Sequence, residues 1–420
     1  MRILILGGGG REHAMAWKLV QSPGVSIFAA PGNPGIAQIG TCCPVADGSP
    51  ESFLSIADHA GADLTVVGPE APLVAGVVDA FRARGRKIFG PDQAAARMEG
   101  SKVFAKSFLT QRHIPTADFV AVDNETDARR ALDRFGFPVV LKADGLAAGK
   151  GVIICPSRPI AIEAAHDLFS GKLLGQPEQQ IVVEEFLEGD EISYLCLSDG
   201  KHVTPLVPAQ DHKRIGEGDK GPNTGGMGVY TTDTMLDPGM NDWILRHIAE
   251  PTVRGMAEEE TPFAGVLYCG LIITARGPQV LEFNARFGDP ETQAILLRLE
   301  SDLVDALEAC IDGRLADTEL RWTPGASACV VASSAGYPGS YKTGFPITGL
   351  SAAARVPGVQ VFHAGSAQVG SQLLTNGGRV LGTAAAAPSL EEALARAYQA
   401  LAEIHFEGIY YRHDIGHRAR

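Results

Sequence analysis

Three polar side chains stand at every second position of an otherwise apolar segment. In VLEFNARFGDPETQ, residues 280–293, these are Glu282, Asn284 and Arg286. Side chains of a strand point alternately to its two faces, so an acid, an amide and a guanidinium would share one surface. Such an arrangement is typical of a functional site. The solvated outer face of a half-buried strand would give the same pattern, so the rest of the chain must decide.

Length and charge limit the possible classes. The chain has 420 residues, of which 45% are hydrophobic and 20% charged, enough for about two to four globular domains. A formal net charge of -13 argues against nucleic acid or a membrane surface as the main partner. A local basic pocket for phosphates, or a small anionic substrate, remains compatible with this charge.

Cysteine usage and hydropathy indicate the compartment. The seven cysteines show no C-x-x-C spacing, and most lie in apolar runs such as GVIIC, which is typical of buried thiols in a reducing environment. The apolar run in MRILILGGGG is too short for a signal peptide, and no later run approaches the ~18 apolar residues of a membrane span. We expect a cytoplasmic protein.

Residues 1–101 alternate strand and helix signals, which predicts an open parallel α/β sheet. Glycine- and proline-bearing turns follow the carboxyl ends of its strands, where ligands of such sheets usually bind. One of them, GGGGREH, has Glu12 where a dinucleotide fingerprint needs its third glycine. That turn could bind a phosphate through backbone N–H groups, or it could be a tight packing turn.

Residues 102–326 show a different succession of predicted elements, with a helix, strands and a glycine-rich turn. The turn KADGLAAGKGV, residues 142–152, lacks the Walker A spacing and is followed by a strand signal. It reads as a hairpin able to fold over phosphates, with Lys142 and Lys150 as charges, or as a floppy hairpin with solvated lysines. The run 214–230 has no periodicity, which predicts a long functional loop.

The segment IVVEEFLEGDE, residues 181–191, leaves a predicted sheet in extended form. Its backbone groups could pair with a base edge and a later carboxylate with ribose hydroxyls, although an edge strand with surface acids would look alike. Residues 327–420 are rich in alanine and glycine and predict a small α+β domain.

Six segments together resemble the phosphoribosylamine–glycine ligases, ATP-grasp enzymes of purine biosynthesis. They are Ser101-Lys102, VVLKADGLAAGKGV, VVEEFLEGDEIS, QDHKRIGEGDKGPNTGGMG, LEFNARFGDPETQ and GGREHAMAWK. The resemblance runs from Met1 to about Gly416. It implies a multidomain α/β and α+β fold: an N-terminal parallel sheet (1–101), a central ATP-grasp domain (102–326) with a lid at about 116–190, and a C-terminal domain (327–420).

The resemblance also implies ATP as co-substrate and Mg²⁺ or Mn²⁺ as the metal, with Glu282 and Asn284 as its ligands. The residues that match the family's nucleotide contacts are Lys102, Lys142, Gly149, Lys150, Gly151, Glu184, Glu185, Leu187 and Glu191.

The implied reaction joins glycine to 5-phosphoribosylamine, giving glycinamide ribonucleotide, ADP and phosphate through a glycyl phosphate. Arg286 would stabilise the acyl phosphate or hold glycine, unless it pairs with Asp289 or Glu291. Asp211 and Lys213 are the other catalytic candidates, although residues 211–214 could merely order the loop. Expected substrate-binding residues are Gly9, Glu70, His212, Asn223, Gly226 and Asp289.

Two departures from the family pattern are visible. The opening turn has glycine where the family more often has Asn as second residue, and Ala285 stands where Cys is common. Rival readings are another ATP-grasp carboxylate–amine ligase, a biotin-type carboxylase, or a non-catalytic nucleotide sensor, which the intact Glu282 and Asn284 disfavour. We expect a monomer with small-molecule substrates and neither nucleic acid nor membrane as partner.

Overall fold

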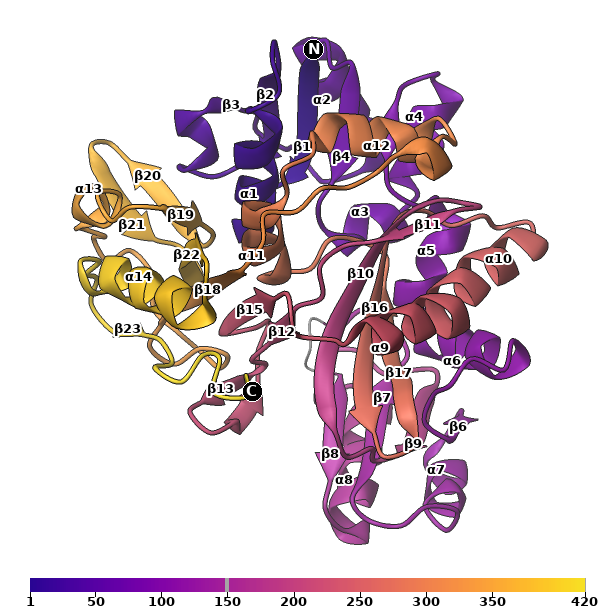
Figure 1. Cartoon of the computed structure of the whole chain (residues 1–420). Helices are drawn as coiled ribbons and strands as arrows, with labels where there is room; N and C mark the ends of the chain where they lie inside the picture. Colours follow the sequence, from indigo (N-terminus) through magenta and orange to yellow (C-terminus); the bar gives the residue numbers. More distant parts are fainter. Residues whose placement is uncertain (148–150, 420) are drawn as a thin grey trace.

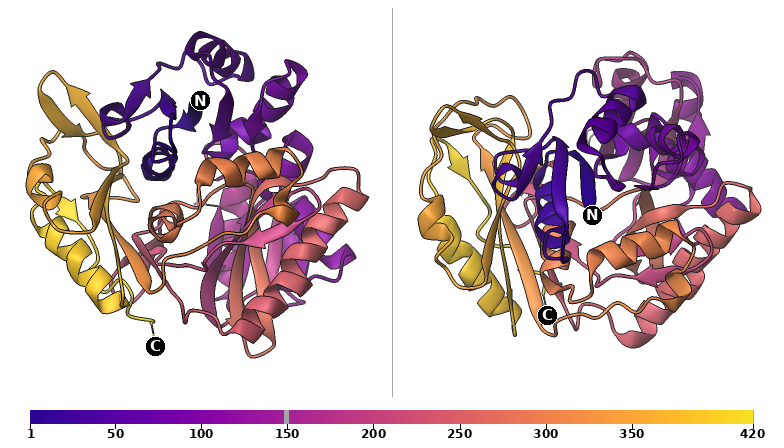
Figure 2. Two further views of the ribbon diagram at one scale, coloured as in Figure 1. Left: turned by 45° about the horizontal axis from the view of Figure 1, so that its top comes forward. Right: turned by 90° about the horizontal axis from the view of Figure 1, so that it is seen from above.

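The structure is a computed structural model that describes residues 1–147 and 151–419 (Figure 1). Four sheets of four or more strands dominate the described residues. In both views of Figure 2 the C-terminal part (yellow) lies on the left and the central part (magenta to orange) extends to the right. Within the described residues no helix combines the length and apolarity needed to cross a membrane.

The N-terminal sheet is parallel, as predicted, with strand order β3-β2-β1-β4-β5. Its strands are β1 (Arg2–Gly7), β2 (Ser26–Pro31), β3 (Gly40–Cys42), β4 (Leu64–Val67) and β5 (Ile88–Phe89). Its helices are α1 (Gly10–Leu19), α2 (Pro50–Ala60), α3 (Glu70–Val74), α4 (Val77–Ala83) and α5 (Gln93–Gly100), with the turn η1 (Ile36–Gln38). The helix expected through residues 74–83 is interrupted because Gly76 takes a left-handed conformation, φ +85°.

The segment expected to form the lid, about 116–190, folds into a second, antiparallel sheet with order β6-β9-β7-β8, and we keep the name lid for it. It contains β6 (Phe119–Val122), β7 (Val139–Ala143), β8 (Val152–Cys155) and β9 (Ile181–Glu185), and follows helix α6 (Lys102–Gln111). Helices α7 (Glu125–Ala131) and α8 (Arg158–Phe169) pack on it. The predicted hairpin around the glycine-rich turn is confirmed by the β7–β8 pairing, and β9 is an inner strand rather than an edge strand.

The central sheet has the order β11-β10-β16-β17 and is also antiparallel. Its strands are β10 (Asp190–Asp199), β11 (Val203–Pro205), β16 (Ala264–Thr274) and β17 (Gly277–Asn284). The accompanying helices are α9 (Pro238–Ile244), η2 (Leu245–Ala249), α10 (Glu250–Glu258), α11 (Glu291–Arg298), α12 (Leu303–Ile311) and η3 (Leu315–Asp317).

The C-terminal sheet takes two strands from before residue 326. Its order is β12-β15-β18-β22-β19, with β23 also on β18. The strands are β12 (Gln210–Asp211), β15 (Gly228–Thr232), β18 (Ala326–Ser334), β19 (Val359–His363), β22 (Arg379–Ala387) and β23 (Ile409–Tyr410), beside the ribbon β20 (Ser366–Val369) and β21 (Gln372–Thr375) and helices α13 (Leu350–Ala353) and α14 (Leu390–Ala402). The sheet therefore crosses the boundary expected at residue 326.

The prediction of an irregular loop over 214–230 is wrong. The segment holds a hairpin of β13 (Arg214–Gly216) and β14 (Lys220–Asn223), and then the start of β15. Strands of three to five residues are too short to show a period of two, and their glycines hid them.

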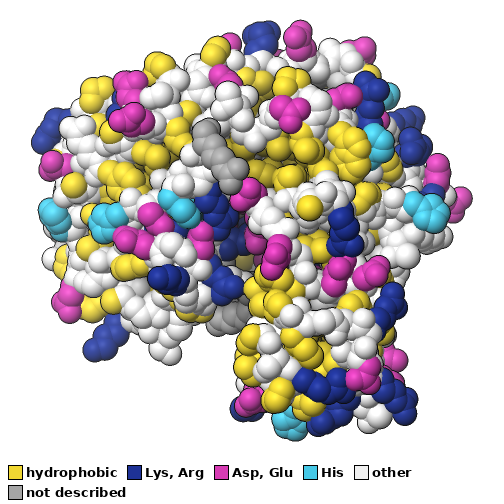
Figure 3. Space-filling view, turned by 60° about the horizontal axis from the view of Figure 1, so that its bottom comes forward, with side chains coloured by type: hydrophobic (Ala, Val, Ile, Leu, Met, Phe, Trp, Pro, Cys, Tyr) yellow, Lys and Arg dark blue, Asp and Glu magenta, His cyan; other side chains and the backbone are white. Residues whose placement is uncertain are grey.

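One apolar cluster joins three parts of the molecule. It contains Ile3 and Ile5 of β1, Leu195 of β10, Ile295 of α11 and Cys329 of β18, all buried. The lid instead has its own cluster, made by its strands and by α7 and α8. The shared cluster fixes the N-terminal, central and C-terminal parts against one another, while the lid projects as a separate lobe (Figure 3).

Candidate active site

Strand β17 presents the two proposed metal ligands on one face. Glu282 and Asn284 are half-buried, whereas the alternate residues Phe283 and Ala285 are 3% and 1% exposed. Arg286 follows just beyond the end of the strand. The alternation predicted from the sequence is therefore confirmed, and the two oxygen-bearing side chains face away from the core.

A β-bulge shapes this face. Val280 pairs with Leu271 and Glu282 with Gly270, which leaves Leu281 as the extra residue of β17. The Leu281 carbonyl accepts a hydrogen bond from Lys142 Nζ at 2.9 Å. Opposite Glu282, a Cβ on Gly270 would lie 3.2 Å from Glu282 Cγ, so a side chain there would crowd the acid.

The charges around Glu282 keep it ionised. Burial alone would raise the pKa of its carboxyl, but Lys213, Lys142 and Lys102 lower that pKa below its ordinary value. No cluster of three or more His, Cys, Asp or Glu side chains with metal-binding geometry exists within the described ranges. Two protein oxygens, from Glu282 and Asn284, fit Mg²⁺ or Mn²⁺ completed by phosphate oxygens and water.

Arg286 connects the end of β17 to the N-terminal part. Its Nη2 lies 2.9 Å from Glu99 Oε1, and its Nε lies 3.3 Å from Glu70 Oε2. The alternative expectation of a pair with Asp289 or Glu291 is thus wrong. Glu99 Oε2 also accepts the Ala285 N–H at 2.7 Å, so Glu99 holds both the guanidinium and the backbone beside it.

Lys142 and Glu184 belong to a buried charge cluster with a residue that the sequence analysis missed. Glu184 is 2% exposed; its Oε1 lies 2.5 Å from Lys142 Nζ and its Oε2 lies 2.6 Å from Lys106 Nζ. Burial lowers the pKa of Lys106 to about 8, although Glu184 opposes this shift. We call Lys106, Glu184 and Lys142 the buried clasp. The spacing of Lys106, four residues after Lys102 on one helix face, was the available signal.

The start of α6 is held by the turn that follows β7. Asp144 Oδ1 accepts the Val103 N–H at 2.8 Å and the Ser101 hydroxyl at 2.9 Å. Lys102 Nζ donates to the Gly145 carbonyl at 3.0 Å, and burial lowers the pKa of Lys102 while Glu282 raises it. Lys102 therefore lies between the glycine-rich turn and Glu282 of β17.

The other expected nucleotide contacts occupy different settings. Gly151 accepts the Ala143 N–H at 2.8 Å within the hairpin, while Gly149 and Lys150 lie outside the described residues. Glu185 Oε1 lies 2.7 Å from Arg276 Nη2. Leu187 is buried against Ala117 and Ile272, and Glu191 pairs with Lys213 at 3.0 Å.

Asp211 and Lys213 face a small cavity of about 10 Å³, room for roughly one water. Its lining residues are Glu191, Ile192, Ser193, Asp211, Lys213, Tyr268, Gly270 and Leu271. Asp211 Oδ1 is buried and finds no hydrogen-bond partner among the described residues. Burial, followed by the charge of Glu291, raises the pKa of Asp211 well above its ordinary value. A Cβ at Gly226 would lie 2.7 Å from Asp211 Oδ1, so this position admits only glycine.

A hydrogen-bonded set absent from the sequence analysis backs this cavity. Ser193 Oγ lies 2.8 Å from the Tyr268 hydroxyl, and both hydroxyls donate to Glu291 Oε1, at 2.9 and 2.7 Å. These residues come from β10, β16 and α11, three elements that no local motif connects.

His212 does not share the cavity. It is 0% exposed; its Nδ1 lies 3.2 Å from the Gly228 carbonyl, and its Nε2 accepts the Gly416 N–H at 3.1 Å. Burial and the charge of Arg412 lower the pKa of His212 to about 4. Both ring nitrogens are thus bonded inside the protein. Asn223 ends β14, opposite Arg214.

Asp289 and Gly9 meet between the N-terminal and C-terminal parts. Asp289 Oδ2 lies 3.3 Å from Arg379 Nη2, and Asp289 Oδ1 accepts Gln293 Nε2 at 2.8 Å. Arg379, from β22, also donates to the Asp289 carbonyl at 2.8 Å, a contact that sequence reasoning missed. The Gly9 N–H donates to Glu12 Oε2 at 2.5 Å, so the opening turn is capped by its own helix.

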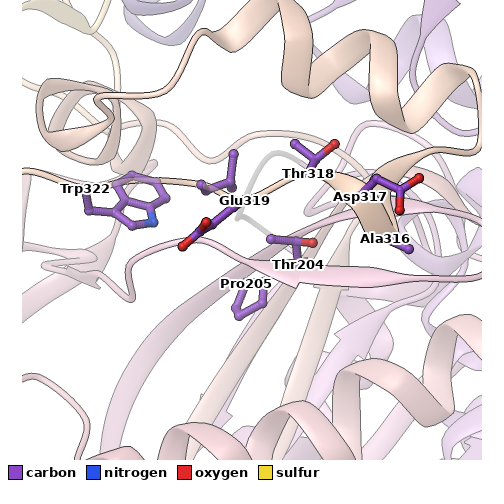
Figure 4. Close-up of a pocket in the computed structure, with 8 residues that line it drawn as sticks. Thr204, Pro205, Ala316, Asp317, Thr318, Glu319 and Trp322 are labelled. Carbon is purple, nitrogen blue, oxygen red and sulfur yellow. The ribbon is translucent and has the colours of Figure 1, made fainter.

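A larger hollow of about 410 Å³ lies away from these groups (Figure 4). It is lined by Thr204, Pro205, Ala316, Asp317, Thr318, Glu319, Leu320 and Trp322. Its lining offers two carboxylates and no cation, which does not suit a triphosphate. In Figure 3, by contrast, Lys and Arg side chains lie in the recess beside the lid lobe.

Family models match the chain in three consecutive stretches. They are the N domain of phosphoribosylglycinamide synthetase at residues 1–99, its ATP-grasp (A) domain at 100–292 and its C domain at 327–418. Phosphoribosylamine–glycine ligases of Vibrio cholerae and Salmonella typhimurium are 48% and 49% identical to it over 423 and 424 residues, covering 100% of this chain and 98% and 99% of theirs.

Solved structures agree with the sequence relatives. The crystal structure of the phosphoribosylamine–glycine ligase of Thermotoga maritima has a TM-score of 0.86 at 34% identity, covering 99% of this chain and 100% of that one. The biotin carboxylase domain of Hydrogenobacter thermophilus 2-oxoglutarate carboxylase, with a TM-score of 0.73 at 17% identity over 97% and 91% of the two chains, shares the fold alone. With all three domain models in order and near-half identity along its whole length, this chain belongs to the phosphoribosylglycinamide synthetase family.

Proposed function

We propose that this chain, an ATP-dependent ligase by its family, joins glycine to 5-phosphoribosylamine in purine biosynthesis. The products are glycinamide ribonucleotide, ADP and phosphate. The observation that carries the proposal is that two oxygen-bearing side chains on one face of β17, Glu282 and Asn284, lie near the positive charges of Lys102, Lys142 and Lys213. The full-length relatives named phosphoribosylamine–glycine ligase support the choice of substrates.

The carboxylate of glycine must be activated before an amine can replace one of its oxygens. Transfer of the γ-phosphoryl group of ATP to that carboxylate gives glycyl phosphate, whose phosphate is a good leaving group. A bound Mg²⁺ or Mn²⁺, held by Glu282 and Asn284, would neutralise charge on the phosphates. Lys102 and Lys142 add positive charge beside the same place, and Arg286, held by Glu99, is positioned for the carboxylate or the acyl phosphate.

The amine of phosphoribosylamine then attacks the acyl carbon, and a proton must leave its nitrogen. Asp211 suits this role because its buried Oδ1 has no hydrogen-bond partner among the described residues and burial raises its pKa, which makes its ionised form a stronger base. The charge of Lys213, which also pairs with Glu191, opposes the rise in the pKa of Asp211 and so favours its ionised form. The positive charge of Arg379 near Gly9 and Asp289 suits the phosphate end of the sugar.

Omission of single substrates tests the proposed reaction. ADP release should require glycine and freshly made phosphoribosylamine together, and the product should carry the glycyl group. Bicarbonate, or another carboxylate and amine, as the pair that triggers ADP release would overturn the substrate assignment. Glu282→Ala should abolish turnover without a large change in thermal unfolding, and wild-type turnover in that variant would refute the metal role.

We also propose that the chain works in the cytoplasm as a monomer. A single chain brings together every group named above, and no second copy is needed to complete the cavity. Sedimentation of the purified protein at micromolar concentration checks the monomer.

A further inference from the structure

The last residues of the chain lie against the segment that carries Asp211 and Lys213. Figure 1 shows the C-terminus beside β13. We call residues 410–418 the C-terminal tail. Tyr398 of α14 holds this tail to its own domain, since its hydroxyl donates to the Arg412 carbonyl at 2.8 Å and accepts the Ile415 N–H at 3.2 Å.

Arg412 is the main link between the tail and the β13–β14 hairpin. Its side chain is 0% exposed, although it carries a full charge. Nη1 donates to the Arg214 carbonyl at 3.1 Å and to Asp219 Oδ1 at 2.9 Å, while Nε and Nη2 donate to the two oxygens of Asp414 at 2.7 and 2.8 Å. A planar guanidinium with partners on both segments fixes their relative position.

Further contacts follow the length of the hairpin. Asp414 Oδ2 accepts the Gly218 N–H at 2.8 Å, and the Tyr410 hydroxyl donates to the Ile215 carbonyl at 2.9 Å. Arg418 Nε donates to Asp219 Oδ2 at 3.0 Å. Strand β13 and the turn of the hairpin are therefore tied to the tail.

His212 carries the same connection into β12. The Gly416 N–H points at Nε2, and the proton on Nδ1 donates to the Gly228 carbonyl, so one neutral tautomer satisfies both contacts. His212 stands between Asp211 and Lys213 in an extended segment, where neighbouring side chains take opposite faces. Fixing His212 on the tail side therefore directs Asp211 and Lys213 toward the cavity.

We propose that the C-terminal tail is a positioning element of the active site, in which Arg412 and Gly416 hold residues 211–223 so that Asp211 and Lys213 meet the amine substrate. This inference rests on the proposed function of the same cavity. The tail contacts lie on β12 and the hairpin, whereas the proposed ATP-side groups lie on α6, the lid and β17, with the exception of Glu191 of β10, which pairs with Lys213. Loss of the tail contacts should weaken use of the amine and leave nucleotide affinity unchanged.

The test compares Arg412→Ala and Arg412→Lys in the full chain, with Arg355→Ala as control because Arg355 is an exposed residue of the same domain. Arg412→Ala should raise the KM for phosphoribosylamine at least tenfold, with the Kd of a non-hydrolysable ATP analogue within twofold of wild type. Hydrogen exchange should become faster at 211–223 and stay unchanged at 181–199. Arg412→Lys should raise this KM less than Arg412→Ala does, since lysine keeps the charge but lacks the planar, forked guanidinium.

Unchanged exchange at 211–223, or equal losses of amine and nucleotide binding, would overturn the positioning role. If Arg412→Ala does not fold, Asp414→Asn carries the same expectations, because it weakens the same contacts from a half-exposed position. Failure of the proposed function is distinguishable: wild type would then show no phosphoribosylamine-dependent ADP release, while the exchange comparison would still report on the tail.

Discussion

The buried clasp and the Asp211 cavity both place charged groups away from water, but they resolve the cost in opposite ways. In the clasp, Glu184 forms ion pairs with two lysines, Lys142 and Lys106, within 2.6 Å. In the cavity, Asp211 Oδ1 has neither a hydrogen-bond nor an ion-pair partner within residues 1–147 and 151–419, and burial raises the pKa of this carboxyl. An ion-paired cluster fixes geometry, whereas a buried carboxyl without an ion pair is available to a ligand, which is how we separate positioning groups from reacting ones.

The largest effect that tests this contrast is expected from Asp211→Asn. The amide has the same shape and cannot accept the amine's proton, so kcat should fall by about 10²–10⁴-fold. The variant should be no less stable than the wild type at neutral pH, because the raised pKa of Asp211 means that its ionisation disfavours the folded state and the amide cannot ionise. Steady-state kinetics measure kcat, and urea unfolding measures the free energy of unfolding. A loss of stability as large as the loss of activity would contradict the distinction between positioning and reacting groups.

Glu184→Gln should act in the reverse way, with its main effect on stability rather than on kcat. It leaves Lys106 and Lys142 buried without a carboxylate, which typically costs about 3–5 kcal/mol. Hydrogen exchange of β7 and β9 should report lid opening even before substrates are added. Normal lid protection in this variant would show that the clasp contributes little to the lid.

Two neighbouring residues sharpen the comparison through pH. His212 has a pKa of about 4, lowered by burial and Arg412, so its stabilising contribution is present above pH 6.5 and is lost as pH falls from 6.5 toward 4. The upper bound is about 3 kcal/mol. Asp211, with a raised pKa, acts oppositely, since stability falls as pH rises above 3.8. The free energy of unfolding should be measured at several pH values. It should depend less on pH below 6.5 in His212→Gln, and less on pH above 4 in Asp211→Asn, than in the wild type.

An exposed ion pair supplies the baseline for these effects. Lys87 Nζ lies 3.1 Å from Glu308 Oε1 at a solvent-exposed position. Lys87→Ala should cost less than about 1 kcal/mol and leave kcat unaltered, because water and salt screen such a pair. A larger loss in thermal unfolding would mean that surface pairs also hold the N-terminal part to α12.

Sequence reasoning reached the groups that lie on one strand or in one motif. The face of Glu282 and Asn284 follows from the period of a strand, and the β7–β8 hairpin follows from its glycines between two apolar runs. Lys106, Arg379 and Arg412 were missed because each meets its partners through tertiary contacts with distant segments. The partners of Arg286 were misjudged for the same reason, since Glu70 and Glu99 are far from it in sequence.

The pairing of β12 and β15 with β18 has a consequence for synthesis of the chain. While residues beyond 325 are still inside the ribosome, β15 has no neighbour on its β18 side and the tail has not yet emerged. A nascent chain could then fold its nucleotide lid but could not align Asp211 and Lys213. The nascent chain would therefore consume no ATP until its synthesis is nearly complete.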